Sequence, residues 1–286
     1  MVRPALAIDI GGTKLAAGVV DDDGRVLVSA ASPTAGDGEA MFAALLALVD
    51  EVRTGDEVVV GVGCGGPMRD GNELVSPLNI PAWRDFPLRH RLADATGLAV
   101  YVDNDAKALA RGEGWRGAAV GHDNFIAMVV STGVGGGIVL DGRLLDGADN
   151  NAGHIGHVIV EPDGRECGCG ARGCLEAEAS GLAIAAITGA PPAHAGLDVI
   201  ERTGRLVGRG IASVANLLDL PLAVVAGSVA LGFGEPFFAA AQAELDARCR
   251  LGFSRGARVV AAGLSAHGPL VGAAAVGFAG LASSGP

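Results

Sequence analysis

The chain has 286 residues, half of them hydrophobic, and a formal net charge of -11. This length suits two packed domains, and so acidic a surface repels phosphate backbones, so we expect no nucleic-acid partner. No apolar run is long enough to span a bilayer, so we expect no membrane partner. The five cysteines form no even disulfide framework, which predicts a cytoplasmic protein.

The first part of the chain predicts a meander of three strands and then alternating helices and strands. Apolar runs within residues 5–29 are separated by the turns GGTK and DDDG, which is typical of strands joined by hairpins. Helical spacing of apolar residues predicts a helix over 39–53. EVVVGVGCGG is expected to be a buried strand, residues 86–96 a short helix, and LAVYV a strand before a helix that starts in AKALAR.

A second meander is expected from Phe125 onward. FIAMVV, STGVGGG and IVLDGRLLDGA predict a strand, a glycine turn, a strand, a turn and a strand, in the order of the first meander. We interpret this as a duplicated architecture with two like domains facing a cleft, although two unrelated glycine hairpins would give the same pattern. After residue 180 we expect mainly helices, with strands in PLAVVAGSVA and ARVVAAGL and a last helix in GPLVGAAAVGFAGLA.

A metal motif lies between His157 and Glu176. His157 is followed by three cysteines within eight residues, Cys167, Cys169 and Cys174, and then by a carboxylate. One histidine and three cysteines are a ligand set that zinc favours in closed tetrahedral sites. The alternatives are a disulfide pair with a spare thiol, redox cysteines, or a random placement of the three cysteines.

Two glycine hairpins predict phosphate binding. Asp9 to Lys14 reads DIGGTK and Thr132 to Gly137 reads TGVGGG, each after an apolar strand. Small residues let backbone N–H groups reach phosphate oxygens, and Asp9 could face a magnesium ion. Two such hairpins facing each other would hold one polyphosphate, but a tight turn explains either hairpin alone.

A third glycine cluster satisfies the G-x-G-x-x-G spacing at Gly61, Gly63 and Gly66. Dinucleotide sites need a helix that begins at these glycines, whereas the chain continues as PMRDGN, which is typical of a turn. We therefore reject a dinucleotide fold. The turn is instead expected to let backbone approach a small ligand.

Polar residues follow the strand LAVYV at Asp103, Asn104 and Asp105. A carboxylate here could take a proton from a substrate hydroxyl during phosphoryl transfer. The alternative is that Asn104 or Asp105 is only the N-cap of the helix over AKALAR. Spacing alone leaves both interpretations open.

Together, DIGGTK, DNDA, STGVGGG and GHIGH followed by CGCGARGCLE resemble the ROK family of sugar kinases and regulators over nearly the whole chain. The resemblance implies an actin-like (ribonuclease-H-like) fold of two α/β domains that close on a sugar and ATP. We expect a small domain at 1–106, to which a last helix near 270–284 can return, and a larger domain with the zinc motif at 107–286. The resemblance also implies a homodimer or homotetramer.

The resemblance implies roles for individual residues. Asp105 matches the catalytic base, and His157 with the three clustered cysteines matches the structural zinc ligands. The positions expected at the sugar are Gly65, Asn79, Asn104, Asp105, His154, His157 and Glu176. The positions expected at ATP and Mg²⁺ are Asp9, Gly11, Gly12, Thr13, Lys14, Thr132, Gly133 and Gly227.

One departure bears on the substrate. Most family kinases carry Glu where this chain has His154, which can donate and accept but differs in reach and charge; bacterial N-acetylmannosamine kinases have a similar AGHIGH. We expect an ATP-dependent kinase acting on the 6-hydroxyl of a hexose, preferably glucose. An N-acyl-hexosamine kinase and a sugar sensor without turnover are the alternatives, and polyphosphate as donor stays open. The family's regulators begin with a helix-turn-helix domain and this sequence begins at a strand, so we expect no such role.

Overall fold

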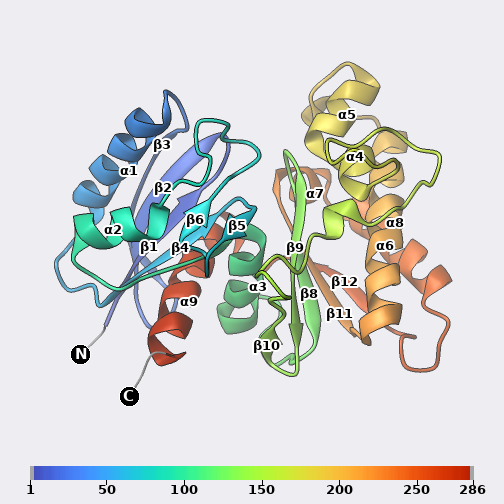
Figure 1. The fold of residues 1–286 in the computed structure, drawn as a ribbon. Helices are drawn as coiled ribbons and strands as arrows, with labels where there is room; N and C mark the ends of the chain where they lie inside the picture. Colours follow the sequence, from blue (N-terminus) through green and yellow to red (C-terminus); the bar gives the residue numbers. More distant parts are fainter. Residues whose placement is uncertain (1–2, 284–286) are drawn as a thin grey trace. The chain divides into compact units, whose positions relative to one another are not determined.

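A computed structural model describes residues 3–283 (Figure 1). Within this range the chain divides into two compact units. The first unit comprises residues 3–117, 145–152 and 263–283, and the second comprises 118–144 and 153–262.

The first unit is built on a five-stranded sheet in the order β3-β2-β1-β4-β7. Its antiparallel meander is β1 (Ala5–Ile10), β2 (Lys14–Val20) and β3 (Val26–Pro33). The next two strands, β4 (Val59–Cys64) and β7 (Val100–Asn104), run parallel to β1. Consequently β1, β4 and β7 all end at the same edge of the sheet.

The second unit has a five-stranded sheet in the order β10-β9-β8-β11-β12. Here β8 (Phe125–Val130), β9 (Val134–Leu140) and β10 (Arg143–Leu144) form the meander. The parallel strands are β11 (Leu222–Ala226) and β12 (Arg258–Ala261). Strand order and directions match those of the first sheet, which confirms the duplicated architecture.

Alternation along β1 assigns the two faces of the first sheet. Leu6, Ile8 and Ile10 are buried in the core cluster that includes α1 (Gly38–Val52) and α2 (Leu88–Thr96). Ala5 and Ala7 instead pack with α9 (Gly268–Ser283). Since side chains alternate along a strand, Asp9 shares the face of Ala5 and Ala7, the face that α9 covers.

The helices of the second unit lie beside its sheet (Figure 1). The long α6 (Leu197–Leu218) packs along α8 (Glu235–Arg248). The shorter elements of this unit are α4 (Leu175–Ala179), α5 (Gly181–Thr188), α7 (Ser228–Phe233) and the 3₁₀ turns Ile155–His157 and Pro192–His194. A further 3₁₀ turn, Ser265–His267, precedes α9, and a two-stranded hairpin pairs β5 (Met68–Arg69) with β6 (Leu74–Val75) in the first unit.

The division of the chain differs from the boundary that we placed at residue 106. The helix α3 (Asp105–Arg116) stays in the first unit because it packs on α9. Its buried Glu113 also accepts the backbone N–H groups of Gly263 and Leu264, at 3.0 and 3.1 Å, where the chain returns to this unit.

One local expectation also changes. The glycine turn expected across 131–137 is shorter, because β9 begins at Val134 and its glycines pair with β8. Trp83 is fully buried, its ring stacks on Phe86 at 4.4 Å, and its Nε1 donates to the Gly38 carbonyl at 2.9 Å. Trp83 is therefore part of the core.

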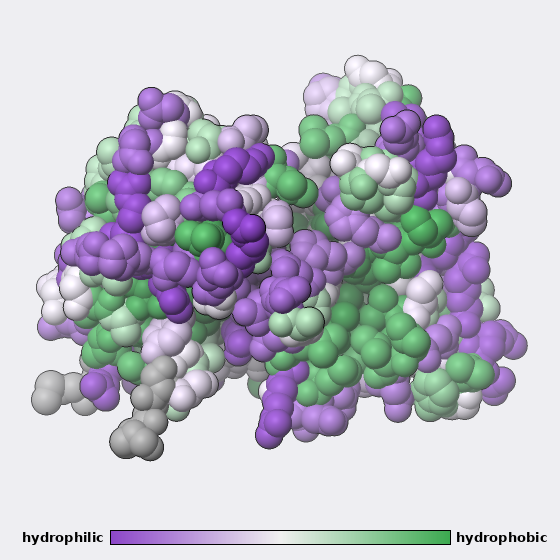
Figure 2. Space-filling model, in the orientation of Figure 1, coloured by the Kyte–Doolittle hydropathy of each residue, from purple (hydrophilic) through white to green (hydrophobic). Residues whose placement is uncertain are grey.

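Polar residues, purple in Figure 2, cover much of the visible face of the first unit, while an apolar area, in green, extends over part of the second. Among the helices within residues 3–283, none is long and apolar enough to cross a membrane.

Gly61→Ala should destabilise the first unit strongly. A Cβ at Gly61, in β4, would overlap the carbonyl oxygen of Ala273 in α9, so helix and sheet would have to separate. We expect a loss of about 2–4 kcal/mol in the free energy of unfolding, the scale of severe core overpacking. Urea unfolding followed by circular dichroism measures it.

Gly232→Ala is the matched control, because a Cβ there, in α7, meets nothing within 4 Å. Alanine in place of glycine in a helix should raise stability by about 0.5–1 kcal/mol. Equal effects of the two substitutions would contradict close packing of α9 on β4.

Candidate active site and metal centre

The ends of β1, β4 and β7 bring two carboxylates together. In the sheet register Asp9 lies beside Gly63, and Gly63 beside Asp103, two residues before Asp105. A Cβ built on Gly63 would lie 3.8 Å from Asp9 Oδ1 and 3.6 Å from the Cα of Asp105. Asp9 and Asp105 therefore flank one point at this edge of the sheet, the place where parallel α/β sheets bind ligands.

The electrostatics of this edge favour a cation. Burial, followed by the negative charge of Asp105, raises the pKa of Asp9 from 3.8 to about 7, against the smaller opposing effect of Lys14. The thiol of Cys64 is fully buried, and its pKa is raised by burial and then by Asp105 and Asp9. A divalent cation would relieve the repulsion between the two carboxylates, and such oxygen ligands suit Mg²⁺.

The helix cap that the sequence left open between Asn104 and Asp105 is formed by Asn104. Asn104 is the N-cap of α3, with its side-chain oxygen accepting the Ala106 N–H at 3.0 Å. Asp105 is the first residue of the helix, exposed to solvent, with one carboxylate oxygen also 2.8 Å from the Ala106 nitrogen. The cap thus holds the backbone of Asp105, a residue that is exposed to solvent.

The first glycine hairpin packs against Asn79. Gly11 N–H donates to the Lys14 carbonyl at 2.9 Å, and Thr13 and Lys14 are exposed. A Cβ at Gly12 would approach the Cβ of Asn79 to 2.6 Å, so only glycine permits this contact. The hairpin and Asn79, two groups assigned to phosphate and sugar from the sequence, are therefore neighbours.

The glycine turn after β4 approaches Asn104. A Cβ on Gly66 would lie 3.4 Å from the side-chain nitrogen of Asn104, and Gly65 comes directly before it. In the described chain Gly66 is followed by Pro67 and β5 rather than by a helix. A dinucleotide site would need a helix there.

The sequence analysis missed a buried lysine behind this edge. Lys107 Nζ lies 3.2 Å from Asp103 Oδ1 and 2.7 Å from Asp146 Oδ1, and it donates to the Asn150 carbonyl at 3.2 Å. Its side chain is 1% exposed. The i,i+4 spacing of Asp103 and Lys107 was a readable signal, but the part played by Asp146 follows only from the fold.

In the second unit the metal motif forms a compact cluster. The ligand atoms of His157, Cys167, Cys169 and Cys174 all lie within 4.8 Å of one another. Cys167 Sγ is 3.7 Å from His157 Nδ1, and Cys169 Sγ is 3.7 Å from Cys174 Sγ. Sulfurs at two corners of a tetrahedron around zinc lie about 3.8 Å apart, so the donor set and its spacing fit this ion.

All five cysteines fall within the described residues and none is in a disulfide. The Ala171 backbone N–H, followed by Cys167, lowers the pKa of Cys169. Burial, followed by the neighbouring sulfurs, raises the pKa of Cys174 to about 12. Several thiols packed this closely resist joint ionisation unless a cation binds them.

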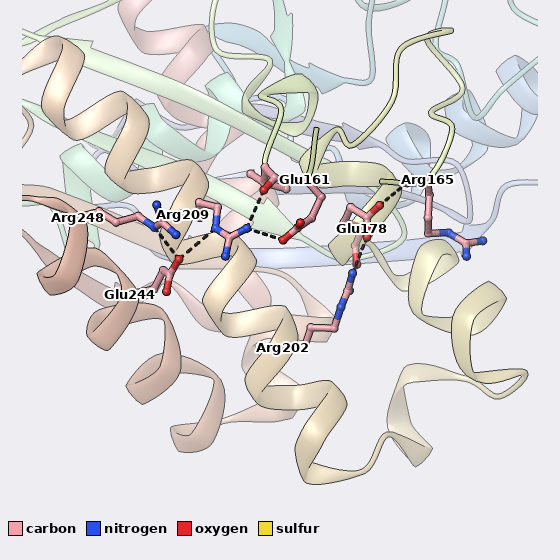
Figure 3. A network of polar contacts seen from close by, with 8 residues as sticks. Glu161, Arg165, Glu178, Arg202, Arg209, Glu244 and Arg248 are labelled. Atoms are coloured by element: carbon pink, nitrogen blue, oxygen red, sulfur yellow. Dashed lines mark hydrogen bonds and ion pairs between the residues drawn. The ribbon is translucent and has the colours of Figure 1, made fainter. Parts of the chain in front are cut away.

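Ion pairs hold the segment between His157 and Glu176, here called the metal loop, against α6 and α8 (Figure 3). Arg209 of α6 pairs with Glu161 of the loop and, at 3.1 Å, with Glu244 of α8. Arg202 of α6 donates to the buried Glu178 at 2.5 Å, and Glu178 also accepts the Arg165 backbone N–H at 2.6 Å. These contacts position the loop on both sides of the cysteines.

The second hairpin is joined to this region by Glu176. One carboxylate oxygen of Glu176 accepts the Val134 backbone N–H at 2.9 Å, and it would lie 2.7 Å from a Cβ on Gly133. Glu176 comes two residues after the ligand Cys174. The ring of the exposed His154 lies 6.0 Å from that of His157. Glu176, which the sequence analysis expects at the sugar, therefore contacts the second glycine hairpin within one unit.

A cavity of about 420 Å³ opens beside Thr132. Leu182, Ala185 and Val229 supply apolar wall, and Ser131 and Ser228 lie at its edge with their hydroxyl oxygens 3.0 Å apart. Gly227, next to Ser228, has φ +102° and leaves no room for a Cβ beside Val130. The cavity suits a flat, largely apolar group.

The ROK family model matches residues 5–277. The chain belongs to the ROK family.

Individual relatives are kinases by name. Over 184 residues, the chain is 42% identical to a glucokinase of Thermotoga maritima, covering 63% of this chain and 58% of that one. It is 40% identical over 249 residues to an N-acetylmannosamine kinase of Citrobacter koseri, covering 80% and 84%. A crystal structure of a ROK family glucokinase from Streptomyces griseus with glucose and AMPPNP superposes with a TM-score of 0.85 at 34% identity, covering 96% of this chain and 99% of that one. The fold is thus the actin-like one expected from the sequence.

Asp9→Asn should stabilise the protein more at pH 8 than at pH 4.5. A carboxyl whose pKa rises on folding, from 3.8 to about 7, favours the folded state at low pH. That contribution is lost as pH rises between these values. Asparagine carries no charge, so we expect a gain of about 2–4 °C in Tm at pH 8, measured calorimetrically without Mg²⁺ or nucleotide.

Asp50→Asn, at an exposed position of α1, is the control and should leave Tm nearly unchanged at both pH values. A pH-independent effect of Asp9→Asn would contradict the raised pKa.

Proposed function

We propose that this chain is an ATP-dependent kinase that transfers the γ-phosphoryl group to the 6-hydroxyl of a hexose, with glucose preferred. The observation that carries the proposal is the pair Asp9 and Asp105 on either side of Gly63, at the shared end of three parallel strands. The similarity to glucokinases supports the reaction class.

Asp105 would be the general base. Its position at the first turn of α3 leaves the carboxylate exposed to an incoming hydroxyl. It would accept the proton of that hydroxyl as the oxygen attacks the γ-phosphorus, a contribution of about 10²–10⁴ in rate. Asn104 and the Gly65–Gly66 turn, which adjoin it, would orient the sugar.

Each unit, taken by itself, offers groups that would bind parts of a nucleotide. The first hairpin offers backbone N–H groups with Thr13 and Lys14, and the second offers Thr132 and Gly133. The 420 Å³ cavity beside Gly227 would take the adenine. Mg²⁺ held near Asp9 would supply charge neutralisation for the phosphates.

The Cys₃His cluster would hold a structural zinc ion. Four protein ligands leave no open coordination position for chemistry. Because the metal loop carries both His157 and Glu176, the ion would act on sugar binding by fixing these two side chains.

An N-acyl-hexosamine is the second candidate acceptor. His154 in place of the family's Glu supports it, as does the similarity to an N-acetylmannosamine kinase. We also propose a cytoplasmic homodimer or homotetramer, for which the absence of disulfides among the five cysteines supports the compartment. A panel of hexoses in a coupled ADP assay, with ATP and polyphosphate compared as donors, separates the candidates from a sensor without turnover.

Asp105→Asn should abolish turnover but keep binding. We expect kcat to fall by about 10²–10⁴, while calorimetry gives sugar and ATP affinities close to those of the unaltered protein. Glu51→Gln, at an exposed position of α1, controls for loss of one charge and should keep full activity. Near-normal phosphorylation by Asp105→Asn would refute the base assignment.

Cys169→Ala should remove the metal without disturbing the core, since Cys169 is the exposed ligand. We expect about one zinc per chain in the unaltered protein by mass spectrometry and a large loss in the variant. Its metal loop should also become sensitive to proteolysis, because structural zinc contributes directly to folding. Cys249→Ala, at a cysteine outside the cluster, should retain the metal. Full zinc content in Cys169→Ala would sink the proposed ligand set.

A further inference from the structure

A second cavity, of about 810 Å³, lies in the first unit between the β5–β6 hairpin and the segment 145–152. Its size falls within the range of small-molecule sites. None of the residues assigned above to sugar, nucleotide or metal lines it. Its lining includes Arg69, Ser76, Asp85, Ala148, Asp149 and Asn151.

Polar contacts hold both walls of this cavity. On one side Arg69 pairs with Asp85 at 2.6 Å, and the Asp85 backbone N–H donates to Ser76 Oγ at 2.9 Å. On the other side the buried Lys107 holds the segment through Asp146 and the Asn150 carbonyl. Both walls of the cavity are therefore held by defined contacts, and Lys107 anchors the segment 145–152 to α3.

The cavity adjoins the residues that we assign to the sugar. Pro67 is part of its lining and directly follows Gly66, which approaches the side chain of Asn104. A group attached to a hexose at Asn104 would thus reach the cavity past the Gly66–Pro67 turn.

The lining indicates what kind of group fits. Asn150, Asn151 and Ser76 offer donors and acceptors without charge, as hydroxyl and amide groups require. The carboxylates of Asp70, Asp85 and Asp149 outnumber the one cation, Arg69, and that cation is already paired with Asp85. A phosphate or another anion would be repelled, whereas an uncharged polyol or amide would be bound.

We propose that this cavity binds an uncharged polar substituent of the acceptor hexose, an N-acyl group or a second glycosyl unit. The inference rests on the proposed kinase function and deepens it. The hexose ring is held at Asn104 and Asp105, and the segment anchored by Lys107 selects what the ring carries.

Ala148→Phe tests the proposal by filling the cavity, at an exposed position that tolerates a larger side chain. The readout is kcat/KM for an N-acyl-hexosamine and for a disaccharide with a free 6-hydroxyl, each divided by kcat/KM for glucose. We expect Ala148→Phe to lower at least one ratio about tenfold or more, mainly through KM. The acceptor whose ratio falls identifies the substituent.

Two further variants complete the design. Asn151→Ala removes a polar group without adding volume and should lower the same ratio less. Ala43→Phe, on the exposed face of α1, adds the same volume elsewhere and should change no ratio. Thermal unfolding of each variant checks that it is folded.

The outcomes distinguish failure of the cavity proposal from failure of the proposed kinase function. Glucose turnover with no detectable turnover of either substituted acceptor overturns the cavity proposal, and so do ratios that Ala148→Phe leaves unchanged. Absence of turnover with every acceptor and donor overturns the kinase function itself.

Discussion

The register between β1, β4 and β7 is the constraint on which the candidate active site depends. Parallel strands carry their ends to one edge, and here that edge sets Asp9 and Asp105 around the single residue Gly63. Burial, and after it the repulsion from the nearby Asp105 carboxylate, raises the pKa of Asp9 to about 7. A divalent cation would offset this repulsion, and carboxylates perturbed in this way mark a candidate functional site.

In the second unit, side chains are held in place by cysteines and ion pairs rather than by strand register. Ion pairs and the clustered cysteines hold the loop between His157 and Glu176. Arg202 and Arg209 of α6 hold the loop at its two ends, and the sulfurs meet at distances suited to zinc. The same loop leads into Glu176, whose carboxylate accepts a backbone N–H of the second glycine hairpin. The Cys₃His cluster and the second glycine hairpin are thus linked through Glu176 within one unit.

Lys107 joins the end of β7 to the segment 145–152. A fully buried ammonium group is costly unless its partners are well placed, and here it has three oxygen partners. Two of these come from the segment 145–152, which the chain contributes after β10 of the other unit. Holding that segment beside α3 creates a polar cavity next to Asn104. This segment follows β10 of the other sheet in the sequence, so the cavity wall depends on a connection between distant parts of the chain.

The sequence by itself determined the strands, the repeated meander, the two glycine hairpins and the candidate metal cluster, because each depends on local periodicity or on close spacing. It could not divide roles between Asn104 and Asp105, since capping and catalysis ask for the same residue types at a strand end. Nor could it place Trp83 in the core, assign α3 to the first unit, or bring Asp146 to Lys107. Those outcomes depend on packing between elements distant in the chain, such as α3 on α9, and only the tertiary structure decides which distant surfaces meet.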